Sequence, residues 1–290
     1  MPELPEMQAL SERLDALLSG AAFSGALALQ FSALKTFEPR PESLVGRELA
    51  GVGRRGKYLV FDLGPDRILV HLSQGGRVFL EDTPGQRQAR SGLGRAAEGA
   101  RPKGGVVRLS FAGRPSVLVR EFGSQRKAAW WVVGTGNDGP LAGLGPEPDS
   151  AAFEDLVLKG GDRRRIHNLL RDQRTVAGIG RGFTDDILWR ARLSPYESLT
   201  ALPPARRREL LETVHSVLDE GLARERRRTG GLPAKLGERF NIHGRYGHPC
   251  PRCGADLRRV SYESYEITYC PVCQTEGRTL ADRRMSRLVK

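Results

Sequence analysis

Apolar residues follow two different periods along the chain, and the change of period divides it into two parts. Between Glu6 and Leu18 they recur at steps of three and four residues, which predicts an amphipathic helix that ends at Ser19-Gly20. From residue 23 to residue 133 they form short or alternating runs between Gly, Pro and charged turns. These runs predict strands over Leu27–Phe31, Leu49–Val52, Tyr58–Leu63, Ile68–His71, Val78–Leu80, Val106–Phe111, Ser116–Val119 and Ala128–Val133. Short strands at this spacing indicate a β-sandwich or a β-barrel.

Helical spacing returns in the second half of the chain. Residues 135–150 are dense in Gly and Pro and predict a linker. Beyond them, apolar steps of three and four residues predict helices over Phe153–Leu158, Ile166–Gln173, Asp185–Ala191 and Pro204–Leu222. The segment Val176–Gly182 has three glycines at alternate positions, which allow tight turns and close backbone approach. It forms either a simple helical hairpin or a turn that presents a helix N-terminus, with Arg181, to a phosphate.

All four cysteines lie near the carboxy end, in two C-x-x-C pairs separated by sixteen residues: Cys250, Cys253, Cys270 and Cys273. Pairs at this separation predict a tetrahedral zinc site with four thiolate ligands. Between the pairs, Leu257–Val260 and Tyr265–Tyr269 alternate like the strands of a hairpin. Four protein ligands leave no open position on the metal, so we expect one structural Zn²⁺ ion. A redox role for the cysteines is the alternative.

These elements place the chain in the α+β class. We expect an N-terminal helix plus β-sandwich domain at 1–134, the linker at 135–150, a helical domain at 151–240, and a zinc ribbon with a basic tail at 241–290. A length of 290 residues suits about two domains, and a hydrophobic fraction of 39% supports packed cores. The chain has no apolar run of ~18 residues and no signal-peptide pattern. We therefore expect a soluble cytoplasmic protein without a membrane partner, monomeric by default.

The charge balance indicates a polyanionic partner. Lys and Arg number 46 against 34 Asp and Glu, which gives a net charge of +12 and a pI near 10.1. Nucleic acid is the simplest partner for this excess, and a generally arginine-rich proteome is the alternative. The segment Glu81–Lys103, rich in Gly, Arg, Gln and Pro, predicts a long mobile loop. Residues 274–290 form a basic tail, in which Leu280, Met285 and Leu288 suit one side of a short helix.

The first six residues carry the most unusual chemistry. A small residue after Met1 favours removal of the initiator, which leaves Pro2 with a free secondary amine. Such an amine titrates at roughly 7.7–8.0 and forms an iminium with an aldehyde-like carbon. Glu3 and Glu6 place two carboxylates beside it as acids or bases. The alternative is an ordinary helix start, because Pro suits the first turn and Glu suits the positive end of a helix.

Taken together, these motifs resemble the formamidopyrimidine-DNA glycosylase / endonuclease VIII family, and most closely its actinobacterial-type members. The resemblance covers nearly the whole chain and rests on Pro2–Glu6, Gly56-Lys57 at a turn of the β-rich half, the glycine turn and the four-cysteine ribbon. It implies a β-sandwich domain followed by a helix–two-turn–helix domain that carries the ribbon. It also implies a nucleoid-associated repair enzyme for double-stranded damaged DNA. That enzyme excises the base through a proline iminium and cleaves the strand by elimination.

The resemblance assigns roles to individual residues. Pro2 matches the nucleophile, Glu3 the carboxylate that handles protons at the sugar, and Glu6 the second acid of the motif. Lys57 matches a hairpin lysine that contacts phosphate beside the lesion. The loop after His71 resembles one that fills the gap left by a flipped nucleotide, and the segment after Val119 resembles a wedge in the opposite strand. The residues expected to bind DNA are His71, Gln74, Arg120, Phe122, Arg181 and Arg245.

Three positions depart from the family pattern. Gln74 stands where the loop commonly carries methionine, and Arg181 stands where the glycine turn ends in a phosphate-binding asparagine. Tyr265 replaces the arginine that is the ribbon's main phosphate contact in the family. We expect residues 277–290, which are rich in arginine, to supply part of the lost contact.

Three function hypotheses follow. The first is a glycosylase with lyase activity on abasic sites, including a member specialised for abasic, bulky or crosslinked lesions, which the three departures favour. The second is a catalytically silent protein that binds damaged DNA, against which the intact Pro2 and Glu3 argue. The third is a zinc protein that binds RNA or DNA through its charge alone.

Overall fold

The structure is a computed structural model that describes residues 1–81, 102–123, 125–228, 239–262 and 265–281. The chain divides into two compact units. The first comprises Met1–Gly143 with Gly221–Pro233, and the second comprises Leu144–Glu220 with Ala234–Lys290. Within the described ranges, no helix is both long enough and apolar enough to cross a membrane.

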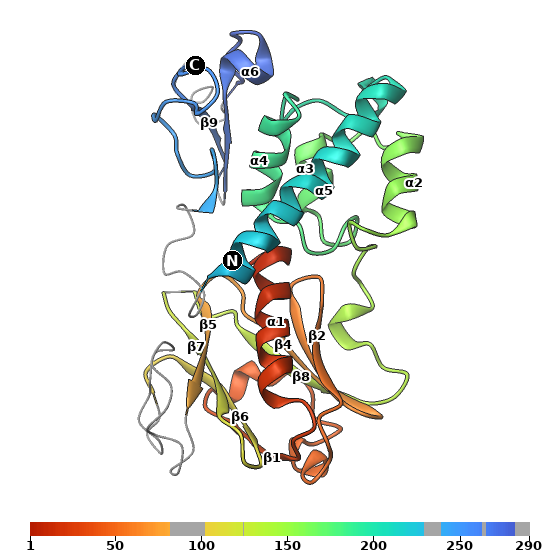
Figure 1. The fold of residues 1–290 in the computed structure, drawn as a ribbon, viewed down its shortest axis with the longest axis vertical. Helices are drawn as coiled ribbons and strands as arrows, with labels where there is room; N and C mark the ends of the chain where they lie inside the picture. Colours follow the sequence, from red (N-terminus) through yellow and green to blue (C-terminus); the bar gives the residue numbers. More distant parts are fainter. Residues whose placement is uncertain (82–101, 124, 229–238, 263–264, 282–290) are drawn as a thin grey trace. The chain divides into compact units, whose positions relative to one another are not determined.

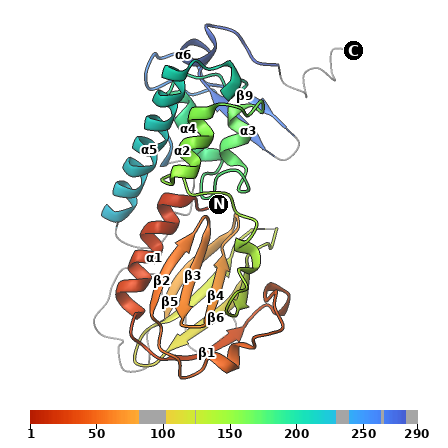
Figure 2. The ribbon, with the colours of Figure 1, turned by 90° about the vertical axis from the view of Figure 1, so that its right-hand side faces the viewer.

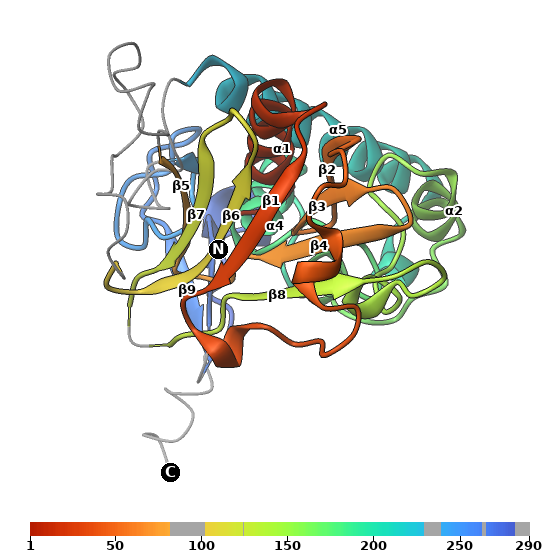
Figure 3. The same cartoon turned by 90° about the horizontal axis from the view of Figure 1, so that it is seen from below.

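The first unit is a β-sandwich with one long helix, α1 (Leu4–Leu18). Its strands are β1 (Phe23–Ala28), β2 (Gly51–Arg55), β3 (Tyr58–Leu63), β4 (Asp66–His71), β5 (Gly76–Glu81), β6 (Gly105–Phe111), β7 (Ser116–Glu121) and β8 (Ala129–Val133). One antiparallel sheet has the order β1-β6-β7-β5, and the other has the order β2-β3-β4-β8. Figure 3 shows the two sheets as separate layers, and Figure 2 shows α1 running beside β2. Short 3₁₀ helices lie at Phe31–Ala33, Pro41–Leu44 and Gly139–Leu141.

Alternating strand residues fill the space between the sheets. In β3, Leu59, Phe61 and Leu63 are buried while the residues between them are less so, because side chains one apart in a strand point to opposite faces. Trp130 of β8 and Met7 of α1 are fully buried in the same core. This continuous core holds α1, and with it the start of the chain, against the sandwich.

Polar contacts fix the position of α1 on strand β2. The carboxylate of Asp15 accepts a hydrogen bond from the Val52 backbone N–H at 2.7 Å. Two helical turns earlier, Gln8 accepts a hydrogen bond from the Arg54 guanidinium at 2.9 Å. The end of α5 also belongs to this unit, since Arg226 pairs with Glu12 of α1 at 2.7 Å.

The second unit consists of helices and a small ribbon. Its helices are α2 (Ala151–Lys159), α3 (Ile166–Arg171), α4 (Arg181–Arg190), most of α5 (Pro204–Arg227) and α6 (Pro271–Thr275), with a 3₁₀ turn at Leu199–Ala201. Strands β9 (Arg258–Ser261) and β10 (Glu266–Tyr269) form the antiparallel ribbon, which packs on α4 (Figure 1). Leucine, isoleucine and phenylalanine side chains from α2 to α5 form one buried core.

The predicted α+β fold is confirmed, and most predicted elements are present within a few residues. The strand predicted over Leu27–Phe31 was misplaced. Strand β1 spans Phe23–Ala28, and Phe31, which is 83% exposed, lies in a 3₁₀ turn. Residues 221–233, assigned from the sequence to the helical domain, group with the first unit, and the predicted segment boundaries stay predictions. Most of the expected loop at 81–103 and the expected tail helix lie outside the described residues.

Candidate functional site

The start of α1 holds the two glutamates of the amino-terminal motif in a reciprocal cap. The Glu6 carboxylate accepts a hydrogen bond from the Glu3 backbone N–H at 2.7 Å, and the Glu3 carboxylate accepts one from the backbone N–H of Glu6. This capping box satisfies two helix-end donors that would otherwise lack partners. Pro2, Glu3 and Glu6 are all buried. The sequence alternative of a plain helix start therefore describes the local structure correctly, and the cap also fixes a carboxylate next to Pro2.

Lys57, in a turn, and His71, at the end of a strand, lie within electrostatic range of each other, and the chain's amino terminus also acts on His71. Lys57 sits in the two-residue turn between β2 and β3, where Gly56 adopts a left-handed φ of 56°. His71 ends β4 and pairs with Tyr58 of β3, and the two rings are 4.7 Å apart. The sheet register thus carries Lys57 and His71 to the same end of the sandwich.

Two other basic groups, Lys57 and the N-terminal amine, lie close enough to His71 to affect its pKa. Burial, and then the positive charges of Lys57 and the N-terminal amine, lowers the pKa of His71 to about 4. His71 is therefore neutral at physiological pH. It can accept a hydrogen bond there, or donate one, without adding a charge to the cluster.

The loop between β4 and β5 is locked onto Phe122. The Phe122 backbone N–H donates to the Gly75 carbonyl at 3.0 Å, and a Cβ added at Gly75 would lie 2.0 Å from the Phe122 carbonyl oxygen. Ser73 adopts a left-handed φ of 53°, a strained conformation of the kind that clusters at functional sites. Gln74 is exposed at the tip of this loop. The predicted gap-filling residue and the predicted wedge therefore form one surface.

Arg120 lies over the aromatic end of this surface. Its guanidinium is 5.1 Å from the ring centre of Phe122 and 5.4 Å from that of Phe79, and it donates to the Lys103 carbonyl at 3.0 Å. Phe122 remains 47% exposed, so its ring is accessible to a partner at this edge. The structure thus brings Gln74, Arg120 and Phe122 together at one edge of the β5–β7 pair.

In the second unit, the glycine turn leads directly into α4. Gly178 adopts a left-handed φ of 97°, and Gly180 is the residue before the first turn of α4, which begins at Arg181. A Cβ added at Gly182 would lie 2.2 Å from the Phe240 ring, so only glycine fits there. The turn places Arg181 at the positive end of α4, the position expected for an anion contact.

Two buried acids of α4, which sequence reasoning missed, hold the segment that leads into the ribbon. Asp185 is fully buried, with His243 Nδ1 at 2.6 Å and His167 Nε2 at 3.2 Å from its carboxylate oxygens. Burial alone would raise the pKa of Asp185, but the two imidazoles outweigh it and lower that pKa. Asp186 accepts hydrogen bonds from the backbone N–H groups of residues 241 and 242. The available signal was an acidic pair between the apolar residues Phe183 and Ile187 of a predicted helix.

Arg245 belongs to this lead-in segment. It is partly exposed, and its guanidinium donates to the Asn241 carbonyl at 3.1 Å. Because Asp186 fixes Asn241 through its backbone and side chain, Arg245 is presented from a rigid loop. The predicted DNA contacts of the second unit, Arg181 and Arg245, thus come from the start of α4 and from a loop tied to α4.

The four cysteines gather as the sequence predicted. Their sulfur atoms all lie within 4.8 Å of one another, close to the ~3.8 Å separation that four thiolates take around one zinc ion. The Trp189 indole N–H donates to Cys250 Sγ at 3.4 Å, and the Cys273 backbone N–H donates to Cys270 Sγ at 3.4 Å. Such outer donors stabilise thiolates and orient them. The residues therefore fit a closed metal site.

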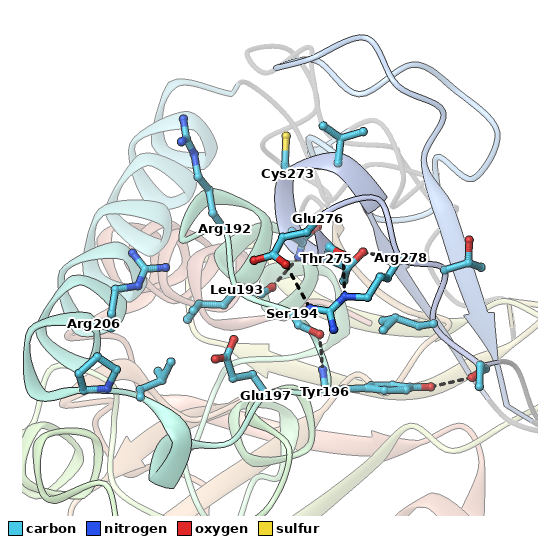
Figure 4. Close-up of a pocket in the computed structure, with 17 residues that line it drawn as sticks. Arg192, Leu193, Ser194, Tyr196, Glu197, Arg206, Cys273, Thr275, Glu276 and Arg278 are labelled. Carbon is cyan, nitrogen blue, oxygen red and sulfur yellow. Dashed lines mark hydrogen bonds and ion pairs between the residues drawn. The ribbon is translucent and has the colours of Figure 1, made fainter.

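A separate pocket of about 760 Å³ lies in the second unit, between the α4–α5 connection and α6 (Figure 4). Figure 4 shows the Glu276–Arg278 ion pair on one wall and Arg206 on another. Its lining residues include Cys273, and none of the candidate catalytic residues. The pocket is therefore distinct from the chemistry expected at Pro2.

Comparisons with known proteins agree with this arrangement. The model of the formamidopyrimidine-DNA glycosylase N-terminal domain matches residues 1–125, and that of the formamidopyrimidine-DNA glycosylase H2TH domain matches residues 144–230. The formamidopyrimidine-DNA glycosylase of Thermus thermophilus is 33% identical over 291 residues, covering 96% of this chain and 100% of the relative. An uncharacterized formamidopyrimidine-DNA glycosylase-like protein of Mycobacterium tuberculosis is 41% identical over 152 residues, covering 51% of this chain and 94% of the relative.

Solved structures show the same fold. The Lactococcus lactis formamidopyrimidine-DNA glycosylase bound non-covalently to DNA with an abasic site has a TM-score of 0.76 and 25% identity, covering 94% of this chain and 99% of that one. A variant of that enzyme in complex with Fapy-dG containing DNA has a TM-score of 0.77 and 25% identity, covering 94% and 100%. The chain belongs to the formamidopyrimidine-DNA glycosylase family, as its motifs predicted.

Proposed function

We propose that this protein is a DNA-repair glycosylase that also cleaves abasic sites through an iminium on Pro2. The observation that carries the proposal is the cluster at the start of α1. There His71 lies within electrostatic range of Lys57 and of the Met1 amine, one residue before Pro2, and a capped Glu3 carboxylate stands beside Pro2. Family membership and the damaged DNA bound by the Lactococcus lactis relative support DNA as the substrate.

The proposed chemistry begins with loss of Met1, which frees the Pro2 nitrogen. That nitrogen forms a bond to the anomeric carbon of the damaged nucleotide as the bond to the base breaks, and the base leaves with a proton. Glu3 donates a proton to the sugar oxygen as the ring opens to the iminium. The iminium acidifies the adjacent carbon, so that removal of one proton there expels the 3′ phosphate and breaks the strand.

Access to the anomeric carbon requires the nucleotide to leave the stack, at a cost of a few kcal/mol. We propose that Gln74 and Phe122 fill the gap and offset part of this cost. Their backbone link through Gly75 supports this, because it holds both side chains on one rigid surface. Lys57, Arg120, Arg181 and Arg245 supply the positive charge that phosphates require. We further propose that the protein acts as a monomer.

The four cysteines, Cys250, Cys253, Cys270 and Cys273, are proposed to hold one structural Zn²⁺ ion. When bound, the metal cross-links two short segments that cannot build a large core of their own. The protein's own part is to align the thiolates through the Trp189 and backbone donors and to pack the cluster on α4.

A trapping experiment tests the proposal. The protein with Met1 removed is incubated with duplexes that carry an abasic site, an oxidised purine or an oxidised pyrimidine, and borohydride is added. A covalent adduct is expected with wild type and with Pro5→Ala, a matched control in the first turn of α1. It should disappear with Pro2→Gly. Tight binding to every duplex without an adduct on any of them would support the silent damaged-DNA-binding protein instead.

The polar and bulky groups Gln74, Arg181 and Tyr265 favour one variant of this function, specialised for abasic or bulky lesions. The rate of adduct formation is measured on the same duplexes and on one further duplex that carries an interstrand crosslink. Faster adduct formation on abasic or crosslinked DNA than on oxidised bases is the expected result. The opposite order would contradict it.

A further inference from the structure

Three tyrosines of the second unit form a cluster at the tip of the ribbon. Tyr262 and Tyr265 flank the turn between β9 and β10, and their rings stack with centres 4.5 Å apart and planes 14° apart. The hydroxyl of Tyr196 lies 3.3 Å from that of Tyr262. We call Tyr196, Tyr262 and Tyr265 the tyrosine cluster.

Two arginines from the ends of α3 lie on this cluster. The Arg165 guanidinium is 3.7 Å from the ring centre of Tyr196, and it donates a hydrogen bond to the Tyr262 hydroxyl at 3.2 Å. The Arg171 guanidinium is 3.9 Å from the ring centre of Tyr265. Stacking of this kind fixes the plane of a guanidinium and leaves its N–H edge available for a bidentate partner.

Neither arginine has a carboxylate partner in the part of the chain that the structure describes. The segment 162–174 contains two acids, Asp162 and Asp172, and both pair with Arg164, at 2.6 and 3.0 Å. The Nε atom of Arg171 is buried and has no hydrogen-bond acceptor among the described residues. With no carboxylate to neutralise it among the described residues, the guanidinium charge of Arg171 remains available to an anion that reaches its terminal nitrogens.

We infer that the tyrosine cluster, with Arg165 and Arg171, is a binding site for phosphodiester groups of the DNA backbone. Phosphate oxygens match the planar N–H edge of a stacked guanidinium, and charge-assisted bonds of this type are the strong ones. The ribbon carries no cation at Tyr265, so Arg171 delivers the charge to the ribbon tip from α3. This inference rests on the proposed function, because it takes DNA as the ligand.

Salt-dependent binding distinguishes a phosphate contact from a purely structural clamp. The zinc-loaded full-length protein is titrated with a fluorescent duplex that carries a tetrahydrofuran abasic analogue, at 50 to 300 mM NaCl as a working range of about sixfold. Arg171→Gln is expected to weaken binding about five- to tenfold at low salt and to reduce the slope of log K against log salt by about 0.9, the value for one phosphate. Arg165→Gln is expected to act in the same direction.

Arg114→Gln is the matched control. Arg114 is an exposed arginine in the β6–β7 turn, at the opposite end of β7 from Phe122. The Arg114→Gln substitution removes one positive charge from the protein, as Arg171→Gln does. An unchanged salt slope in Arg114→Gln would show that the lower slope of Arg171→Gln is not caused by the change in net charge. Melting temperature and zinc content of Arg171→Gln report whether the ribbon has been disturbed. Arg171→Lys, which keeps the charge without the planar fork, should recover part of the slope.

The outcomes separate the two proposals. A wild type that forms the borohydride adduct, together with an Arg171→Gln variant of unchanged affinity and slope, would overturn the phosphate site and leave the proposed function standing. A wild type that neither binds the duplex nor forms an adduct would overturn the proposed function itself. If millimolar inorganic phosphate raised the melting temperature of wild type but not of Arg171→Gln, while DNA bound equally to both, the site would take free phosphate and the inference would be wrong.

Discussion

His71 gives the most quantitative prediction, because the structure links its protonation to two other charges. Its pKa is lowered from 6.5 to about 4 by burial, Lys57 and the N-terminal amine. Each pKa unit corresponds to about 1.4 kcal/mol, so the shift is worth about 3 kcal/mol of folding free energy. The unfolded chain binds a proton at this residue below pH 6.5, whereas the folded protein does so only near pH 4.

The sign of the effect follows from linkage. Between pH 6.5 and about 4 the unfolded state holds more protons at His71, so stability is complete above pH 6.5, falls as the pH drops, and levels off below about 4. His71→Gln removes this dependence. Wild type should therefore lose about 3 kcal/mol more than His71→Gln when the pH falls from 7 to 4, measured by urea unfolding at each pH.

A second measurement isolates the cause. Proton NMR of the imidazole should give a pKa near 4 in wild type, and Lys57→Met should raise it while leaving it below 6.5, because burial remains. A His71 that titrates near 6.5 in wild type, or one that ignores the Lys57 substitution, would refute the proposed clustering of these groups.

Three further predictions concern the second unit. Asp185→Asn should destabilise it by about 3 kcal/mol in urea unfolding, because it removes a buried charge between two histidines. Gly182→Ala should cost about 1–3 kcal/mol, since the added Cβ would lie 2.2 Å from the Phe240 ring, whereas Gly161→Ala, with nothing within 4 Å, should change stability by less than about 0.5 kcal/mol. Chelation of the metal should lower the melting temperature and change Trp189 fluorescence, because the indole contacts Cys250.

Local patterns predicted most of the fold, and the failures have a physical cause. The β3 strand and the α5 helix follow directly from periodic burial, and the paired C-x-x-C motifs predicted the cysteine cluster. The misplaced first strand shows the limit of this reasoning. Leu27 is 48% exposed and β1 is an edge strand, so its position is set by hydrogen bonds to β6 and not by burial of its apolar residues.

Some residues of the candidate site could be predicted from local sequence, and others could not. Pro2, Glu3 and Lys57 were accessible from sequence because each stands in a short local motif. The partners of Asp185 were not, because His243 is 58 residues away and only the packing of the ribbon on α4 brings them together. The contact between Arg171 and Tyr265 was missed for the same reason. Long-range pairs between partly polar residues leave no periodic signal along the chain.

The backbone hydrogen bond between Phe122 and Gly75 limits which residues of the β4–β5 loop can be substituted. In the β4–β5 loop, the side chain of Gln74 is exposed to solvent. The next two residues are glycines with no room for a Cβ. At Gly75 it would collide with the Phe122 carbonyl, and at Gly76 it would lie 2.2 Å from the Leu72 carbonyl oxygen. Among residues 74 to 76, only residue 74 can therefore be exchanged for other side chains without a clash. A combinatorial library across 72–76 should return many side chains at that position and glycine at the next two, and it would test whether the proposed gap-filling residue sets lesion preference.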